Sequence, residues 1–183
     1  MTDTRTSGRE QGRRLYSVAQ IQHVLRTEFG RAQRYRYPIV CLMISIDQLG
    51  ALRDQLGYEA KEIVFDAVVT LLEDATRGSD FLGRTADDRL LAVLPHTGIE
   101  GARTLSARLF HEVRQLEIPE GLAGARLTLS IGASASANDG PAPEGMLFHD
   151  ALLVAAESAL SDAMAAGGAQ LVEKDPGSQG AGP

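Results

Sequence analysis

The sequence contains a single cysteine, Cys41, in 183 residues. One cysteine excludes any disulfide within the chain, which favours a protein of a reducing compartment over a disulfide-stabilised secreted domain. No apolar run approaches the roughly 18 residues that a membrane-spanning helix needs, and the N-terminus lacks the apolar core of a signal peptide. We therefore expect a soluble, cytoplasmic protein that does not bind membranes.

Positive charge is also scarce. The chain has 18 Lys and Arg residues against 24 Asp and Glu residues, a formal net charge of −6. This balance argues against a general nucleic-acid-binding protein, which would usually present a basic surface. The histidines His23, His96, His111 and His149 are scattered and show no metal-ligand spacing. The sequence therefore predicts neither a metal site nor a bound cofactor.

The length and the hydrophobic content of 44% predict a single domain with a substantial core. Residues 1–14 are polar and show no periodicity, and residues 175–183 are rich in Gly and Pro. Both segments are expected to be disordered tails. The predicted domain therefore spans residues 15–174.

The sequence predicts helices in five places, of which the first and third show apolar residues at helical spacing and the second is polar. The first follows an N-cap at Ser17, the second is short and ends at Gly57, and the third has Gly78 as its stop signal. In this third helix the expected buried face consists of Ala60, Ile63, Val64, Ala67, Val68, Leu71 and Leu72. The fourth helix is expected to open with a Thr97–Glu100 capping box and to run to about Leu116. The fifth is Ala-rich and covers residues 146–166.

Five segments rich in apolar residues predict strands between these helices. They are Ile39–Asp47, 80–84, 90–95, 125–135 and 169–173. The second and third are separated by a tight turn and form a hairpin, which makes the predicted sheet mixed rather than purely parallel. The order of the segments therefore predicts an α/β sandwich with a mixed central sheet flanked by helices.

Several stretches, taken in this order, resemble the GGDEF family of diguanylate cyclases between about Leu15 and Val172. The stretches that carry the resemblance are "EFGRAQRYRYP", "LMISID", "SDFLGRTADDRLLAVLP", "LTLSIGAS" and "AAESALSDAMAAGGAQLV". The resemblance implies the palm-like sandwich of nucleotidyl cyclases. It also implies a place in bacterial second-messenger signalling, since these enzymes condense two GTP molecules into cyclic di-GMP.

The signature turn of the family, G-G-D/E-E-F, falls on Ala86, Asp87, Asp88, Arg89 and Leu90. Both glycines are therefore absent, and with them the free access to positive φ and the close approach of a phosphate to the backbone. Asp88 keeps the carboxylate that the family uses as a metal ligand. The arginine next to it places a positive charge where the divalent cations of phosphoryl transfer would lie.

The other catalytic positions implied by the resemblance have changed as well. The first-strand metal ligand falls on Ser45, a far weaker ligand for Mg²⁺ than a carboxylate. The guanine-reading positions fall on Arg53 and Glu62, the triphosphate-binding positions on Met164 and Gly168, and the Asn-Arg pair ahead of the first helix on Ser17 and Val18. We therefore expect a degenerate member without catalytic residues or cyclase activity.

Two interpretations of the acidic residues stay open at this point. Asp47, Asp87 and Asp88 could assemble a metal site in some other way. The favoured interpretation is that Asp87, Asp88 and Arg89 form a solvated turn with a local ion pair.

A second motif of the family is intact. Arg77 and Asp80 match the R-x-x-D motif that binds cyclic di-GMP as a feedback inhibitor, and Arg108 matches a further arginine that completes this site in family complexes. Arginine can grip a phosphate or a guanine edge with two hydrogen bonds, and a carboxylate can accept hydrogen bonds from guanine. The alternative is purely structural: Arg77 would be a helix-end cation followed by Gly78 at C′.

These residues predict a pseudoenzyme that binds cyclic di-GMP through Arg77, Asp80 and Arg108 and signals through a bacterial partner protein. The arginine at position 108 would either close the site or reach in from a second protomer, which gives a ligand-linked homodimer. The alternative function is a nucleotide-independent protein-interaction scaffold, and an active diguanylate cyclase is disfavoured.

Overall fold

The computed structural model describes residues 15–116, 127–136 and 149–176. Its elements are α1 (Val18–Tyr35), β1 (Ile39–Ile46), α2 (Leu49–Leu56), α3 (Tyr58–Ala75), β2 (Phe81–Arg84), β3 (Leu90–Pro95), α4 (Ile99–Val113), β4 (Leu129–Ala135), α5 (His149–Ala165) and β5 (Leu171–Glu173). The predicted order of helices and strands is confirmed. Both predicted tails lie outside the described residues except for 175 and 176, and so does the expected start of the fifth helix at 146–148.

The described strands form one sheet in the order β2-β3-β1-β4-β5. The central strand β1 pairs antiparallel with β3 and with β4, whereas β5 pairs parallel with β4. The sheet is therefore mixed, as predicted. Because both faces of β1 are covered, its residues form an almost continuous apolar run rather than an alternating one.

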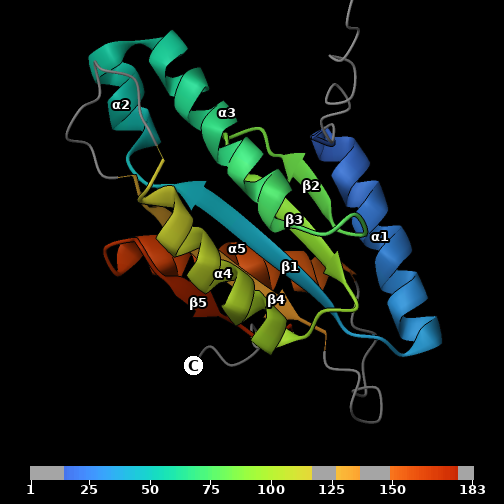
Figure 1. The fold of residues 1–183 in the computed structure, drawn as a ribbon. Helices are drawn as coiled ribbons and strands as arrows, with labels where there is room; N and C mark the ends of the chain where they lie inside the picture. Colours follow the sequence, from blue (N-terminus) through green and yellow to red (C-terminus); the bar gives the residue numbers. More distant parts are fainter. Residues whose placement is uncertain (1–14, 117–126, 137–148, 177–183) are drawn as a thin grey trace, which may run out of the picture.

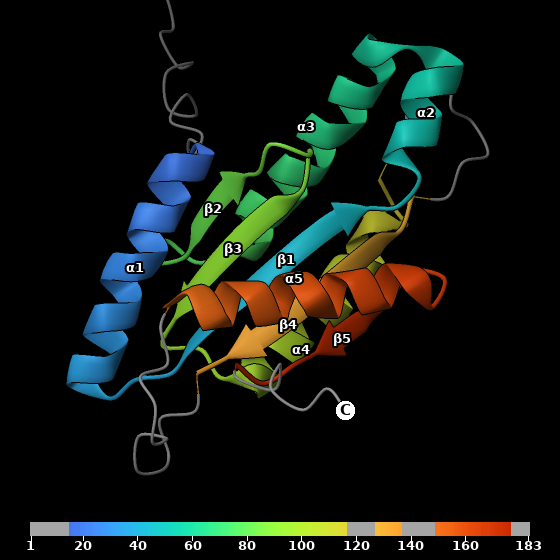
Figure 2. The same cartoon turned by 180° about the vertical axis from the view of Figure 1, so that it is seen from behind.

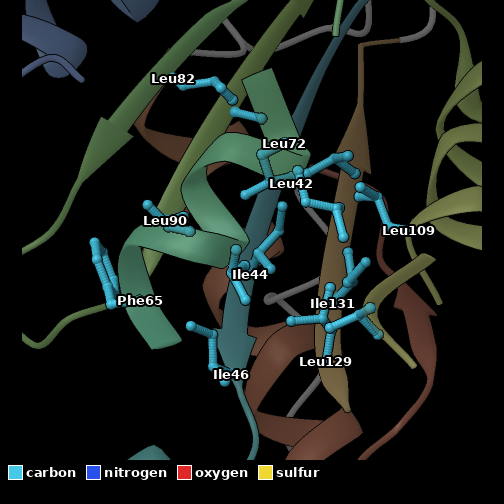
Figure 3. Packing of buried hydrophobic residues seen from close by; sticks show 14 of the residues in the cluster. Leu42, Ile44, Ile46, Phe65, Leu72, Leu82, Leu90, Leu109, Leu129 and Ile131 are labelled. Atoms are coloured by element: carbon cyan, nitrogen blue, oxygen red, sulfur yellow. The ribbon is translucent and has the colours of Figure 1, made fainter. Parts of the chain in front are cut away.

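The side chains of β1 alternate between two hydrophobic cores. Leu42 and Ile44 belong to the core under α3 and α4, where Figure 3 shows them close to Leu72 of α3. Cys41 and Met43 point the other way, into the core under α1 and α5. Helices α3 and α4 thus cover the face seen in Figure 1, and α5 and α1 cover the face seen in Figure 2. The result is the predicted sandwich.

One glycine sets the distance between α5 and the sheet. A Cβ atom at Gly132 of β4 would lie 2.1 Å from the carbonyl oxygen of Ala156 and 2.2 Å from the backbone nitrogen of Leu160. Only a residue without a side chain lets α5 approach the sheet this closely.

The two predicted N-caps have different outcomes. Ser17 forms a capping box with Gln20: its hydroxyl accepts from the Gln20 N–H, and the Gln20 side chain accepts from the Ser17 N–H. The capping box predicted at Thr97 and Glu100 is wrong. The N-cap of α4 is Gly98, and the Thr97 hydroxyl donates instead to the carbonyl of Pro95.

The buried face of α3 also differs from the prediction. Ile63 is 45% exposed, while Phe65 and Lys61 are buried at 1% and 5%. The stripe of apolar residues in the sequence is wider than the surface that the sheet covers, so Ile63 falls outside it. The helix ends at Ala75 rather than at Gly78, which is not among the described residues with positive φ.

No helix among the described residues combines the length and the apolar character that crossing a bilayer requires.

Candidate functional site

A cleft of about 330 Å³ lies between the C-terminal end of β1 and the turn that joins β2 to β3. Since β1 and β3 are antiparallel neighbours, the end of β1 lies beside the start of β3. Most of the positions that the resemblance assigns to catalysis therefore lie around this one cleft. The cleft is lined in part by Ser45, Arg53, Asp87, Asp88, Arg89 and Met164.

The β2–β3 turn is closed by local hydrogen bonds and one ion pair. The backbone N–H of Thr85 donates to the carbonyl of Arg89, and the Thr85 hydroxyl accepts from the Arg89 N–H. Nε of Arg89 lies 2.9 Å from Oδ2 of Asp87, whose side chain is 55% exposed. For these residues the predicted solvated turn with a local ion pair is confirmed.

Asp88 is as exposed as Arg89, at 33% against 31%, but its ion pairs reach beyond the turn, which the prediction of a local ion pair did not include. Its backbone has φ of +60°, in the left-handed region that aspartate tolerates better than most residues. This conformation directs the carboxylate toward α3 and β2. Oδ2 lies 2.5 Å from Nζ of Lys61, and Oδ1 accepts from Nε of Arg84 at 3.0 Å.

The same two cations hold Glu62. Oε1 of Glu62 lies 2.9 Å from Nζ of Lys61 and accepts from Nη2 of Arg84 at 3.0 Å, while Oε2 accepts from Nη1 of Arg84 at 3.3 Å. The Arg84 guanidinium also lies over the Phe65 ring, 4.0 Å from its centroid. We call Lys61, Glu62, Arg84 and Asp88 the four-charge cluster.

Neither Lys61 nor Arg84 was among the functional residues predicted from the sequence. A signal for Lys61 was present: it lies in register with the buried Val64, Phe65 and Val68 on α3, at spacings of three, four and seven residues. A lysine in an apolar register is rarely buried without a partner. The partner itself, Asp88, could not be found this way, since it is distant in sequence.

The cluster shifts the protonation of its members toward the charged forms. Hydrogen bonds from Arg84 and then from Lys61 lower the pKa of Glu62 to about 2. The hydrogen bond from Lys61 likewise lowers the pKa of Asp88, and those carboxylates raise the pKa of Lys61. All four groups are therefore charged at neutral pH, and their formal charges cancel.

These residues do not fit a divalent metal ion. The resemblance implies carboxylates at positions 45 and 88, but Ser45 offers a neutral hydroxyl, and both oxygens of Asp88 already face cations. Mg²⁺ needs hard, anionic oxygen ligands. Within the described parts of the chain, no group of three or more His, Cys, Asp or Glu side chains could hold a metal ion.

Asp47 does not contribute to an alternative metal site, because it fastens the C-terminal end of β1 to β4 and to the turn before β5. Its carboxylate accepts from the hydroxyls of Thr128 at 2.7 Å and Ser130 at 2.6 Å, and from the Ala169 N–H at 3.0 Å. A Cβ atom at Gly168 would lie 3.1 Å from Oδ2 of Asp47. The triphosphate position at Gly168 thus packs against this carboxylate and bears no cation.

The Arg77–Asp80 motif forms a compact turn just after α3. Oδ2 of Asp80 accepts from the backbone N–H of Arg77 at 2.6 Å, and the Asp80 N–H donates to the Arg77 carbonyl at 3.0 Å. Asp80 is only 8% exposed. Its second oxygen, Oδ1, is buried and has no hydrogen-bond partner within the described residues. The Arg77 side chain is exposed.

Arg108 reaches this turn from the neighbouring helix. From α4 its Nη2 donates to the carbonyl of Ala75, the last residue of α3 and two residues before Arg77. The contact lies within one protomer. The fold therefore brings Arg77, Asp80 and Arg108 to the same end of α3. Arg77 directly follows the C-cap Thr76, so it lies just beyond α3 and does not itself end the helix; the structural alternative for Arg77 stays open.

A second cleft, of about 540 Å³, opens beside Asp80. Its wall includes Tyr16, which forms a parallel bridge with Gly83 and an edge-to-face contact with Phe81, with ring centroids 6.0 Å apart. The lining residues are Leu15, Tyr16, Gln20, Gly78, Asp80, Phe81 and Leu82. Sequence analysis gave no indication of this cleft, because it depends on the segment before α1 packing against β2.

Comparison with known proteins identifies one family. The family model described as "Diguanylate cyclase, GGDEF domain" matches residues 13–170. Over 120 residues the chain is 26% identical to the probable diguanylate cyclase DgcC of Escherichia coli, a match that covers 66% of this chain and 32% of DgcC. The match thus spans about a third of the length of that relative.

Solved structures agree on the fold. The diguanylate cyclase SiaD of Pseudomonas aeruginosa, solved in complex with its activator SiaC, superposes with a TM-score of 0.76 at 24% identity over 87% of this chain and 59% of that one. The GGDEF domain of DgcB from Caulobacter crescentus, solved with c-di-GMP, gives 0.77 at 15% identity over 94% and 97%. At these identities the similarity shows the fold alone.

Proposed function

Because the chain belongs to the diguanylate cyclase GGDEF domain family, we propose that it is a catalytically inactive member that binds cyclic di-GMP through Arg77, Asp80 and Arg108. The observation that carries this proposal is the buried Oδ1 of Asp80, which has no hydrogen-bond partner among the described residues, on a residue that also lines the 540 Å³ cleft. A buried polar atom without a partner is costly, and a ligand that donates a hydrogen bond to it removes that cost.

The chemistry of the three residues suits this ligand. Cyclic di-GMP carries two phosphates and two guanines. The exposed guanidinium of Arg77 can pair with a phosphate in two hydrogen bonds, and the N–H groups of guanine can donate to a carboxylate. Arg108 already lies at the end of α3, within one protomer. The relative DgcB, solved with c-di-GMP, adds support from the family.

The four-charge cluster supports the loss of catalysis. Phosphoryl transfer depends on metal ions that neutralise the developing charge on the phosphates. In this chain the carboxylate oxygens of Asp88 and Glu62 already form ion pairs and hydrogen bonds with Lys61 and Arg84. Incubation with GTP and Mg²⁺ or Mn²⁺ should therefore yield no cyclic di-GMP above a blank. Clear turnover that disappears in Asp88→Ala would contradict this.

Isothermal titration with cyclic di-GMP tests the receptor role. Wild-type protein should bind at micromolar concentration, and Arg77→Ala should abolish this binding. The matched control is Arg34→Ala, which removes an exposed arginine at the far end of α1 and should leave the affinity unchanged. Absence of heat with wild-type protein at high micromolar ligand would leave the protein-interaction scaffold as the function.

We also propose that the bound form contacts a partner protein; the similar diguanylate cyclase SiaD was solved in complex with its activator SiaC. Light scattering with and without cyclic di-GMP tests the accompanying homodimer. If Arg108 reaches a second protomer, Arg108→Ala should reduce ligand-driven dimerisation more than the first binding event. If it closes the site within its own protomer, the first binding event should weaken instead.

A further inference from the structure

The 330 Å³ cleft at the C-terminal end of β1 is lined by a cation of the chain itself, Lys61. We propose that the Lys61 ammonium, held between Asp88 and Glu62, supplies to Asp88 the positive charge that a divalent metal ion would otherwise supply, as a covalently attached cation that holds the β2–β3 turn against α3. This inference rests on the proposed loss of catalysis and is independent of ligand binding at Asp80.

The geometry around Nζ is that of an enclosed cation. It lies 2.5 Å from Oδ2 of Asp88, 2.9 Å from Oε1 of Glu62 and 4.9 Å from the centroid of the Tyr58 ring. The Lys61 side chain is 6% exposed. Charged side chains are almost never buried to this degree unless they are paired. The two carboxylates and the ring face thus provide the partners that water would otherwise provide.

The charge balance excludes a further cation. Lys61 and Arg84 neutralise Glu62 and Asp88, so an incoming divalent ion would meet two positive charges within contact distance of the same carboxylates. Without Lys61, the remaining three residues carry a net negative charge and one oxygen of Asp88 loses its cation. Lysine 61 is therefore the group whose removal should open the site to a metal ion.

The chain offers a matched control. Its only other lysine, Lys174, pairs with Asp162 at 2.6 Å near β5, with a side chain that is 27% exposed. Replacing either lysine with methionine removes one positive charge and keeps an unbranched side chain that is one heavy atom shorter. A difference between Lys61→Met and Lys174→Met therefore reports on the cleft and not on net charge.

Two measurements on the full chain test the proposal. Thermal unfolding should show a melting temperature roughly 4–8 °C lower for Lys61→Met than for wild type, and a smaller decrease for Lys174→Met. Mn²⁺ titration followed by paramagnetic broadening of amide signals should show broadening centred on Glu62 and Asp88 in Lys61→Met. Wild type and Lys174→Met should show no broadening there.

A double variant keeps the test decisive if Lys61→Met folds poorly. Lys61→Met/Asp88→Asn removes the opposing carboxylate charge, and asparagine tolerates the left-handed backbone at position 88. This variant should regain part of the lost melting temperature and should not bind Mn²⁺ at the cleft.

Three results would overturn the proposal: broadening at Asp88 in the wild-type protein, equal melting temperatures for the two single variants, or a double variant no more stable than Lys61→Met. None of these results depends on cyclic di-GMP. A failure of the receptor proposal and a failure of this one can therefore be told apart.

Discussion

Two carboxylates of this protein differ in how many hydrogen-bond partners the fold gives them: Asp88 has partners at both oxygens, and Asp80 at one. Asp88 is about a third exposed, yet both of its oxygens face cations of the same chain. Asp80 is 8% exposed, yet one of its oxygens has no partner among the described residues. In the 330 Å³ cleft, the oxygens of Asp88 already have partners within the chain. In the Arg77–Asp80 turn, one oxygen of Asp80 can still accept a hydrogen bond.

The comparison shows why motif positions alone do not measure binding capacity. A ligand gains little from a group that must first give up an equally good internal partner, because the exchange leaves the number of contacts unchanged. It gains most where the fold has already desolvated a polar atom and left it unpaired. On this basis the site at Asp80 is the better candidate, although its residues are fewer.

The largest expected effect is that substitutions at these two carboxylates change different properties: ligand affinity at Asp80 and thermal stability at Asp88. Asp80→Asn should weaken cyclic di-GMP binding by roughly ten-fold to over a hundred-fold, since a charge-assisted contact contributes about 1.5–3 kcal/mol. Asp88→Asn should leave this affinity unchanged and lower the melting temperature instead. Titration calorimetry and thermal unfolding of both variants measure the two effects. Equal loss of affinity in both variants would refute the separation of the two regions.

The next effect concerns the second cation of the cluster. Arg84→Met should lower the free energy of unfolding by about 1–2 kcal/mol, because Arg84 pairs with both Glu62 and Asp88 and covers the Phe65 ring. The estimate stays modest because the three charged side chains are about a quarter to a third exposed. Urea unfolding provides the measurement. A change below about 0.3 kcal/mol would mean that the contacts of Arg84 contribute little to stability.

Acid should weaken the cluster in a defined pH window. The pKa of Glu62 is about 2 in the fold against an ordinary value of 4.5, so the fold favours the charged form. The corresponding stability is present above about pH 4.5 and is lost as the pH falls toward 2. Melting temperatures between pH 7 and pH 2.5 should therefore decrease more steeply for wild type than for Glu62→Gln. Parallel curves would argue against this linkage.

The smallest effect is expected at the exposed ion pair of the same turn. Asp87→Ala should change the free energy of unfolding by no more than about 1 kcal/mol, because its partner Arg89 and the carboxylate both remain accessible to water. Urea unfolding beside Asp88→Asn compares two adjacent carboxylates directly. A larger decrease in the free energy of unfolding for Asp87→Ala than for Asp88→Asn would contradict the stronger contribution assigned to Asp88.

The sequence predicted the architecture well because apolar periodicity depends on local spacing. The buried run of β1 and the Ser17 cap were predicted within one residue. Failures occurred where a residue has two local options. Thr97 had capping-box spacing but bonds to Pro95 instead, and Ile63 had helical spacing but lies outside the surface covered by the sheet.

For the two candidate sites, the sequence by itself determined which residues are present: the charges at the β2–β3 turn, the loss of the family's metal ligand at Ser45, and the Arg77–Asp80 motif. Only the tertiary structure decided their partners. Lys61 meets Asp88 because α3 crosses the start of β3, and Asp80 becomes buried because the segment before α1 packs against β2. The physical reason is that burial and Coulomb attraction depend on distance in space, which residues far apart in sequence acquire only when the sheet is assembled.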